Sequence, residues 1–317
     1  MNNTGFVAGT LVHTDKGLVP IQELKVGDRV LSRDEHNPNG ELFYKRVLNT
    51  FVSSQKQKIV RVAYNTVKDE VTDAKIKEIE DSGQFYSVNE LTDVFYIYCT
   101  QNHAFWTECT EYHAYWPKEE GWLSAVDFAQ DDKEYRDKDY SLFTHNDRPI
   151  FQTSFFTFST PLIRTNIEEI AVQQDHLASE PGDIYNFIDF SEGKPVILKN
   201  VDVYKSSQHN WWDERQDYID LKKHPNHRLV KKIQADNDFM VIDVYFYERG
   251  LFDKDGITDS YKNLTSEERA YHSAKSDEEQ YYLATVYNIE VEDHHTYFVG
   301  EHGVWVHDAS LNNQPNQ

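Results

Sequence analysis

The sequence predicts a mainly β protein made of short strands and frequent turns. Short runs rich in Val, Ile, Thr, Tyr and Phe recur along the chain, and turn residues such as Gly, Asp and Pro separate them. Few stretches carry a helical pattern. Hydrophobic residues make up 39% of the 317 residues and aromatic residues 14%, so the chain is too apolar to be disordered.

The first predicted strands lie near the beginning of the chain. Phe6–Thr14 combines strand-forming residues with partial alternation, and Asp15–Gly17 is a turn signal after it. Leu18–Leu24 is the next apolar piece. Gly27–Asp28 is a second tight turn, which leads into another strand.

The middle of the chain continues this pattern with one interruption. Leu42–Phe51 and Lys58–Tyr64 form a predicted strand pair, and Val94–Thr100 is the strongest strand signal in the chain. Between them, Asp69–Asp81 is predicted as a surface insertion with a short helix. Gly121–Phe128 is expected to form a short turn or helix that docks one Trp.

The remainder mixes strand-like runs with polar loops. Residues 130–150 are charged and predicted as loop, and Ser266–Gln280 is predicted as a helix. Residues 284–308 read as three strands separated by two turns, and residues 309–317 as a flexible tail. The strand-like runs between these parts are Phe151–Phe158, Pro195–Tyr204 and Phe239–Tyr247.

Charge and composition exclude several classes of protein. The chain has 32 Lys and Arg against 54 Asp and Glu, a net charge of −22, which opposes binding to nucleic acid and to anionic membrane surfaces. Two cysteines cannot build a disulfide framework or a zinc finger. We expect no signal peptide and no membrane span, because no run approaches the ~18 apolar residues that a span needs.

Three separated blocks resemble one known family. The first opens with Phe6–Thr10, and the second holds Thr100–His103 followed by Trp122. The third runs from Val286–Gly300 to Val304–Asp308. In this order they resemble the Hint family, the Hedgehog/intein self-processing fold, and most closely the bacterial (pretoxin) Hint domain of polymorphic toxins. The resemblance implies a compact all-β Hint fold with a large mixed β/α insertion.

The first position of the family's N-terminal block normally carries Cys or Ser, which attacks the preceding peptide carbonyl. Gly5 occupies this position here, so the resemblance implies a vacated nucleophile position and a disabled acyl shift. Thr4 would need a shift of one residue to replace it, and we disfavour it. The sequence does not separate a natural loss at Gly5 from an engineered one.

The second block implies a catalytic pair. In the family, Thr100 and His103 would orient the first scissile bond, with His103 giving a proton to the departing amide nitrogen. A strand-end Thr with a hydrogen-bonded surface His is the simpler alternative. Because Gly5 removes the acyl shift that this pair would serve, we expect the pair to be inactive.

The third block implies the main reaction. Asp308 stands where the family usually has an Asn that cyclises and cleaves the bond after it. The scissile bond would be Asp308–Ala309, with a cyclic anhydride as product. His307 and His295 are the candidates for protonating the leaving nitrogen or polarising the carbonyl. Asn288 is a possible orienter. A terminal strand without chemistry is the alternative.

Other residues with reactive side chains carry weaker signals. Cys99 is expected to pack in the core, and Cys109 to lie near the surface. His224 and His227 do not form a recognised metal pattern, so we predict a loop and no metal site. The pair Trp211–Trp212 fits either a packed corner or a partner surface.

The leading hypothesis is an intein-like self-processing domain that cleaves its own chain after Asp308 and releases a C-terminal toxin or effector. The expected parts are a core of residues 5–128 and 284–308, an insertion of residues 130–283 that offers a possible site for a protein partner, and a tail at residues 309–317. Its substrate is its own polypeptide, the reaction has a single turnover, and no cofactor is needed.

Two alternatives remain. One is a catalytically inactive Hint scaffold that serves as a linker or interaction module in a toxin polyprotein. The other is a hydrolase or nuclease centred on the histidines of the insertion. The localisation stays open; the resemblance implies a soluble part of a secreted or cell-surface-delivered bacterial protein.

Overall fold

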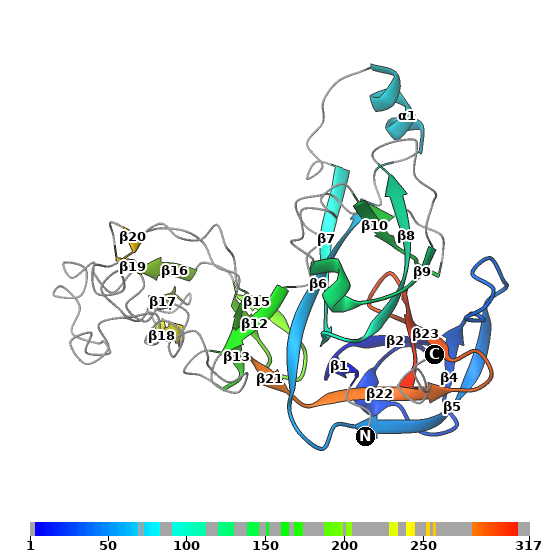
Figure 1. The fold of residues 1–317 in the computed structure, drawn as a ribbon, viewed down its shortest axis with the longest axis horizontal. Helices are drawn as coiled ribbons and strands as arrows, with labels where there is room; N and C mark the ends of the chain where they lie inside the picture. The colour runs from blue at the N-terminus through cyan, green and yellow to red at the C-terminus, as the bar shows by residue number, and fades with distance from the viewer. Residues whose placement is uncertain are drawn as a thin grey trace, which may run out of the picture. The chain divides into compact units, whose positions relative to one another are not determined.

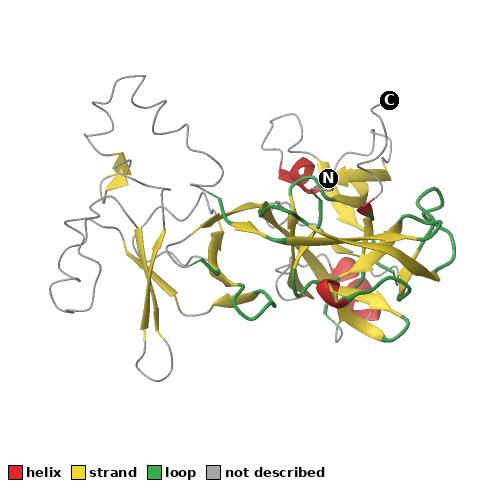
Figure 2. Cartoon of the chain, turned by 90° about the horizontal axis from the view of Figure 1, so that it is seen from below, coloured by secondary structure: helices red, strands yellow, loops and turns green. Residues whose placement is uncertain are grey.

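The computed structural model is mainly β, as the sequence predicts (Figure 2). It separates into two compact units, residues 1–160 with 284–317, and residues 161–283. The structure describes residues 4–68, 71, 73–82, 91–111, 120–129, 138–145, 150–151, 160–164, 168–173, 187–198, 201–204, 228–233, 239–244, 252–253, 256–257 and 281–309.

The first unit contains the three sequence blocks. Its described strands are β1 (Phe6–Val7), β2 (Leu11–Thr14), β3 (Gly17–Pro20), β4 (Arg29–Ser32), β5 (Phe43–Val52), β6 (Gln57–Val67), β7 (Thr92–Thr100), β8 (Ala104–Glu111), β9 (Glu120–Ser124), β10 (Lys138–Leu142), β11 (Ile150–Phe151), β22 (Val286–Val291), β23 (Thr296–Val299) and β24 (Val304–His307). Its described helices are the 3-10 helices η1 (Ile21–Glu23) and η2 (Ala125–Ala129) and the α-helix α1 (Asp73–Ser82).

Strand β1 joins the beginning of the chain to its middle and its end. Phe6 pairs with Tyr287 of β22 on one side and with Cys99 of β7 on the other. In Figure 1, β1 is blue and lies beside β22, drawn in orange. Strand β22 continues antiparallel along β5, and β6 and β7 form a long hairpin. These pairings bring the ends of β1, β7 and β22 together.

A hairpin of β23 and β24 carries the last residues of the third block. Thr296 pairs with His307 at its open end, where the chain leaves β24. Val306 pairs with Phe105 of β8, and Val299 pairs with Val12 of β2. The end of β24 is thereby placed next to the beginning of β8, directly after the second block.

Buried apolar side chains of these strands form the core of the first unit. Phe6, Ile289, Tyr297 and Val306 are fully buried in one cluster. Trp106, Phe298 and Trp305 form a second cluster, in which the Trp305 ring stacks on that of Phe298. Burying aromatic side chains of this size contributes a large part of the hydrophobic stabilisation.

The second unit is described in part. Strands β12 to β15 form antiparallel pairs in sequence order, with Phe187 and Ile188 fully buried. Its strands are β12 (Thr160–Arg164), β13 (Ile170–Gln173), β14 (Phe187–Asp189), β15 (Val196–Leu198), β16 (Val201–Tyr204), β17 (Arg228–Ile233), β18 (Phe239–Val244), β19 (Phe252–Asp253) and β20 (Gly256–Ile257), and β21 (Leu283–Ala284) lies at the junction with the first unit.

Three expectations about local structure are tested. The short helix expected in Asp69–Asp81 is confirmed as α1. Residues 130–150 were expected to be loop, but β10 forms there, because its backbone pairs with β8. Gly121–Phe128 is expected to form a short turn or helix. Its first part instead extends as strand β9, which pairs with β8, and the short helix η2 follows.

Other expectations lie outside the described residues. These are the helix at Ser266–Gln280, the histidines His224 and His227, the pair Trp211–Trp212, the side chain of Cys109 and the tail beyond Ala309. Within the described ranges, no helix has both the length and the apolar character that crossing a membrane requires.

Candidate active site

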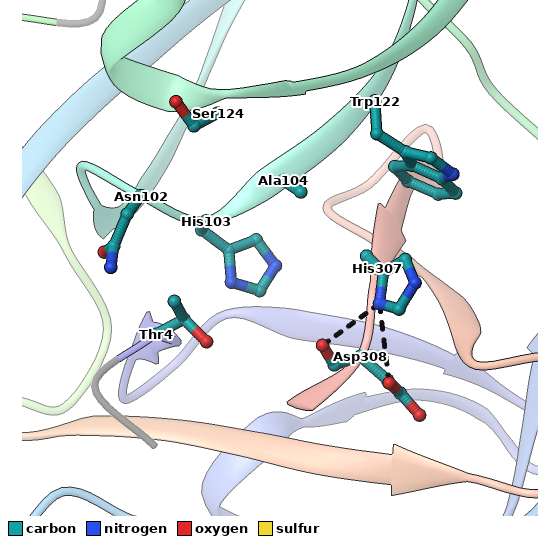
Figure 3. Close-up of a pocket in the computed structure, with 8 residues that line it drawn as sticks. All are labelled: Thr4, Asn102, His103, Ala104, Trp122, Ser124, His307 and Asp308. Carbon is teal, nitrogen blue, oxygen red and sulfur yellow. Dashed lines mark hydrogen bonds and ion pairs between the residues drawn. The ribbon is translucent and has the colours of Figure 1, made fainter. Parts of the chain in front are cut away.

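A pocket of about 210 Å³ in the first unit collects residues from the second and third sequence blocks, together with Thr4, which lies just before the first block (Figure 3). The strand pairings explain this, because the ends of β1, β7 and β24 meet there. The pocket is lined by Thr4, Asn102, His103, Ala104, Trp122, Ser124, His307 and Asp308.

Asp308 follows β24 and has a side chain that is 0% exposed. Its backbone N–H donates to the carbonyl of His295 at 2.8 Å. Its Oδ2 accepts a hydrogen bond from the backbone N–H of Val291 at 2.8 Å, and His295 Nδ1 lies 3.5 Å from the same oxygen. The backbone hydrogen bond therefore fixes the orientation of the carboxylate, and the His295 imidazole lies beside it.

His307 contacts two carboxylates and a carbonyl. Its Nδ1 lies 3.2 Å from the carbonyl oxygen of Asp308 and 3.5 Å from Asp308 Oδ1, as the dashed lines in Figure 3 mark. Its Nε2 lies 2.7 Å from Glu35 Oε2. Burial would lower the pKa of His307, but the hydrogen bonds to Asp308 and Glu35 outweigh it, so the pKa is raised.

His103 is buried beside these groups but behaves differently. Its ring lies 4.1 Å from that of Phe6, centroid to centroid, and neither ring nitrogen has a hydrogen-bond partner among the described residues. Burial, assisted by the nearby His307, lowers the pKa of His103 to about 3. At neutral pH the pocket thus holds one uncharged and one protonation-prone histidine.

Both the N–H and the carbonyl group of the peptide bond between Thr4 and Gly5 are hydrogen-bonded. The Gly5 N–H donates to Thr100 Oγ1 at 3.1 Å, and Asn288 Nδ2 donates to the Thr4 carbonyl at 3.2 Å. The Tyr297 hydroxyl donates to Asn288 Oδ1 at 2.9 Å, which sets the orientation of the amide. Asn288 therefore orients the Thr4 carbonyl.

Gly5 approaches β22 so closely that no side chain fits. A Cβ added at this position would lie 2.5 Å from the carbonyl oxygen of Tyr287. This contact is with backbone, so the strand itself would have to move. The structure thus supplies a physical reason for glycine at this position.

The turn before β23 presents His295 to the site. His295 and Asp293 have positive φ angles of 55° and 62°, a conformation that is uncommon for residues other than glycine. Ion pairs of Arg46 with Glu292 and of Lys45 with Asp293 connect this turn to β5. The turn is thereby held in a conformation that keeps His295 beside Asp308.

No protein-family model and no curated protein matches the sequence. Among solved structures, the chain is similar to a bacterial intein-like domain from Clostridium thermocellum, at 15% identity and a TM-score of 0.32 over 96% of this chain and 98% of that chain. It is similar to a DnaB intein from Synechocystis sp., at 8% identity and a TM-score of 0.33 over 96% and 98%. A gp41-1 intein is similar at 18% identity and a TM-score of 0.23 over 47% and 76%.

The pocket brings together several residues singled out from the sequence. His103, His307 and Asp308 line it, and His295 contacts Asp308. Ala309, on the far side of the expected scissile bond, is buried. Cys99 is fully buried, as expected, and burial raises the pKa of its thiol, which disfavours a role as substitute nucleophile.

One contact residue carried no sequence signal. Glu35 lies in the loop between β4 and β5 and binds His307, 272 positions away in the sequence. A single acidic residue in a polar loop is indistinguishable from its neighbours without a fold. Within the described part of the chain, no group of three or more His, Cys, Asp or Glu side chains could hold a metal ion.

Proposed function

We propose that the chain is an intein-like, Hint-type self-processing domain that cleaves its own backbone between Asp308 and Ala309. The observation that carries the proposal is the contact of His307 Nδ1 with the carbonyl oxygen of Asp308, at 3.2 Å. An imidazole N–H at this oxygen polarises the carbonyl and stabilises the negative charge that develops there during attack. The attacking carboxylate belongs to the same residue.

The reaction follows from these groups. A carboxylate oxygen of Asp308 attacks the carbonyl carbon of Asp308, and a five-membered ring forms. The C–N bond to Ala309 then breaks, and the Ala309 nitrogen takes a proton from His307 and leaves as an amine. Water opens the cyclic anhydride and regenerates an Asp308 carboxylate, now with a free C-terminal carboxylate. Preorganisation of one peptide bond supplies the catalysis.

The N-terminal half of the site is proposed to bind without cleaving. Thr100 and Asn288 hold the Thr4–Gly5 peptide, but Gly5 has no side chain to attack the Thr4 carbonyl. His103, whose pKa burial lowers to about 3, is uncharged at neutral pH and can serve there only as a neutral hydrogen-bonding group. The acyl shift, and with it splicing, is absent in this proposal.

The wider organisation is part of the proposal. The first unit is the processing domain, its substrate is its own polypeptide, and the segment that begins at Ala309 is what cleavage releases. In a longer chain of the polymorphic-toxin kind, that segment would be a toxin or effector. The second unit would serve recognition of a protein partner.

The test is a time course of intact mass across pH. The wild-type chain is expected to lose residues 309–317, whereas Asp308→Ala removes the nucleophile and stays intact, and His307→Ala cleaves at least about 100-fold more slowly. Asp15→Ala, at an exposed aspartate on the turn between β2 and β3, is the matched control and should cleave like wild type. Equal cleavage in Asp308→Ala would contradict the proposal.

A second candidate function is an inactive scaffold of the same kind. The close approach of Gly5 to Tyr287 favours it, because the backbone of Tyr287 leaves no room for a nucleophilic side chain at position 5. Under this alternative the wild-type mass stays constant at every pH, and His307→Ala changes nothing. The same time course therefore separates the two candidates.

A further inference from the structure

Glu35 lies at the edge of the pocket and makes a short contact with His307. Glu35 Oε2 is 2.7 Å from His307 Nε2, and the two side chains are 17% and 4% exposed. The Trp122 ring packs edge-on against His307, at 5.0 Å between centroids. At this distance and degree of burial, an imidazole and a carboxylate form a strong, directional hydrogen bond.

The surroundings of His307 determine where its protons lie. A carboxylate only accepts, so the nitrogen facing Glu35 carries a proton. The other nitrogen faces the carbonyl oxygen and Oδ1 of Asp308, at 3.2 and 3.5 Å, and these also only accept. Both ring nitrogens of His307 therefore point at acceptors. Only the doubly protonated imidazolium satisfies both contacts at once.

We infer that Glu35 is a positioning residue for cleavage, which holds His307 as an imidazolium with its Nδ1–H directed at the Asp308 carbonyl. Without Glu35, the neutral ring with a proton on Nδ1 alone would satisfy Asp308, and the ring could turn. The inference rests on the proposed function of the pocket, but the pairing of Glu35 with His307 has a readout of its own.

The proton balance of the step follows from this arrangement. Before attack, Asp308 is a carboxylate and His307 an imidazolium. When the C–N bond breaks, the Nδ1 proton passes to the Ala309 nitrogen, which leaves as a neutral amine. His307 is then neutral, and its remaining proton stays on Nε2, bound to Glu35. Glu35 keeps the ring in place throughout and does not itself react.

The other titratable groups nearby leave this arrangement intact. His103 is kept uncharged by burial, so it does not oppose a positive charge on His307. His295 lies on the other carboxylate oxygen of Asp308. His36, which is 85% exposed, lies 3.6 Å from Glu35 Oε1, the carboxylate oxygen that His307 does not contact. The two carboxylates facing His307, those of Glu35 and Asp308, dominate its surroundings.

The experiment measures His307 directly in the full chain. Histidine is labelled with ¹⁵N, and the ring nitrogens are titrated by NMR before cleavage proceeds, with His307→Ala to assign the signals. Cleavage rates are recorded over the same pH range by intact mass. Glu35→Gln removes the charge and keeps the shape. Glu41→Gln, an exposed glutamate of the same loop, is the control.

In the wild type, we expect His307 to titrate above the ordinary value of 6.5 and to carry protons on both nitrogens at neutral pH. In Glu35→Gln the midpoint should fall by about one pH unit, so cleavage slows by up to about tenfold at pH values above the wild-type midpoint and approaches the wild-type rate near pH 5. Glu41→Gln should match the wild type in both readouts.

Each other outcome has a defined meaning. An unchanged His307 midpoint in Glu35→Gln overturns the pairing, whatever the cleavage rate. A wild-type chain that never cleaves removes the proposed function, and the titration alone then decides the pairing. If Glu35→Gln does not fold, the wild-type titration decides, and a His307 midpoint at or below the ordinary value overturns the inference.

Discussion

Two histidines in one pocket have opposite electrostatic environments. His103 has apolar neighbours and no hydrogen-bond partner among the described residues, whereas His307 has two carboxylates. The pKa of His103 is lowered to about 3 and that of His307 is raised. Two pKa values shifted in opposite directions are typical of sites in which one of two similar groups acts as an acid and the other stays uncharged. Here the difference in pKa assigns the proton to His307 and leaves His103 uncharged.

The buried His103 predicts a loss of stability in acid. Its pKa is about 3 in the folded chain and near 6.5 in the unfolded chain, so unfolding takes up a proton between these values. The contribution is fully present above pH 6.5 and is lost as pH falls, by about 1.4 kcal/mol for each unit. Chemical denaturation at pH 7.5 and 4.5 should show a smaller drop for His103→Leu than for wild type.

The control for this prediction is an exposed histidine. His36→Ala should keep the wild-type drop, because its ring is 85% exposed and its removal leaves the buried His103 in place. Identical pH dependence in wild type and His103→Leu would show that His103 does not resist protonation in the folded chain.

The close packing around Gly5 predicts that a side chain cannot be added at this position without cost. Its substitution by Cys places a Cβ 2.5 Å from the Tyr287 carbonyl, which should cost about 1–3 kcal/mol of unfolding free energy. Added thiol should release no N-terminal fragment from Gly5→Cys. Gly121→Ala, where a Cβ meets nothing within 4 Å, is the control for stability. Efficient thiol-dependent release from Gly5→Cys would contradict the close approach.

At the scale of elements, the β23–β24 hairpin determines where Asp308 lies. Thr296 pairs with His307, and the next residue on each side, His295 and Asp308, share a backbone hydrogen bond. Strand β24 in turn pairs with β8, whose first residues follow His103. The site therefore depends on a hairpin that is anchored by its aromatic side chains.

Trp305 is the anchor whose removal should loosen β24 most. It is fully buried, its ring stacks on Phe298, and it lies 5.0 Å from the Trp106 ring, centroid to centroid. Trp305→Ala should lower the free energy of unfolding by about 3–5 kcal/mol and slow any cleavage. Val52→Ala, on the exposed side of β5, should cost little by comparison. Denaturant unfolding measures both, and equal costs would contradict the role of Trp305.

Much of the fold and part of the site could be predicted from local pattern. The run of strand-forming residues in Val94–Thr100 and the turn at Asp293–His295 depend on neighbours in sequence, so both are visible without a structure. Glu35 could not be predicted, because its contact with His307 exists only once β4, β5 and β24 are packed together. The close approach at Gly5 was hidden for the same reason. β10 was missed because its pairing with β8 outweighs its charged sequence.

At the scale of the whole molecule, the described site residues all belong to the first unit. The second unit has buried side chains of its own, such as Phe187 and Ile188. We therefore predict that replacing residues 161–283 by a flexible linker leaves the first unit folded and its proposed cleavage intact. Circular dichroism and intact mass check this. A first unit that unfolds on this replacement would show that the second unit is part of its structural support.

The proposed cleavage between Asp308 and Ala309 is tested most directly by the fragments that it would leave. Purified wild-type chain is incubated at neutral pH, and the large fragment is identified by intact mass and by its C-terminal residue. We expect a fragment that ends at Asp308, together with a peptide that begins at Ala309. A chain whose mass never changes, or a fragment that ends at any other residue, would contradict cleavage by Asp308 and His307.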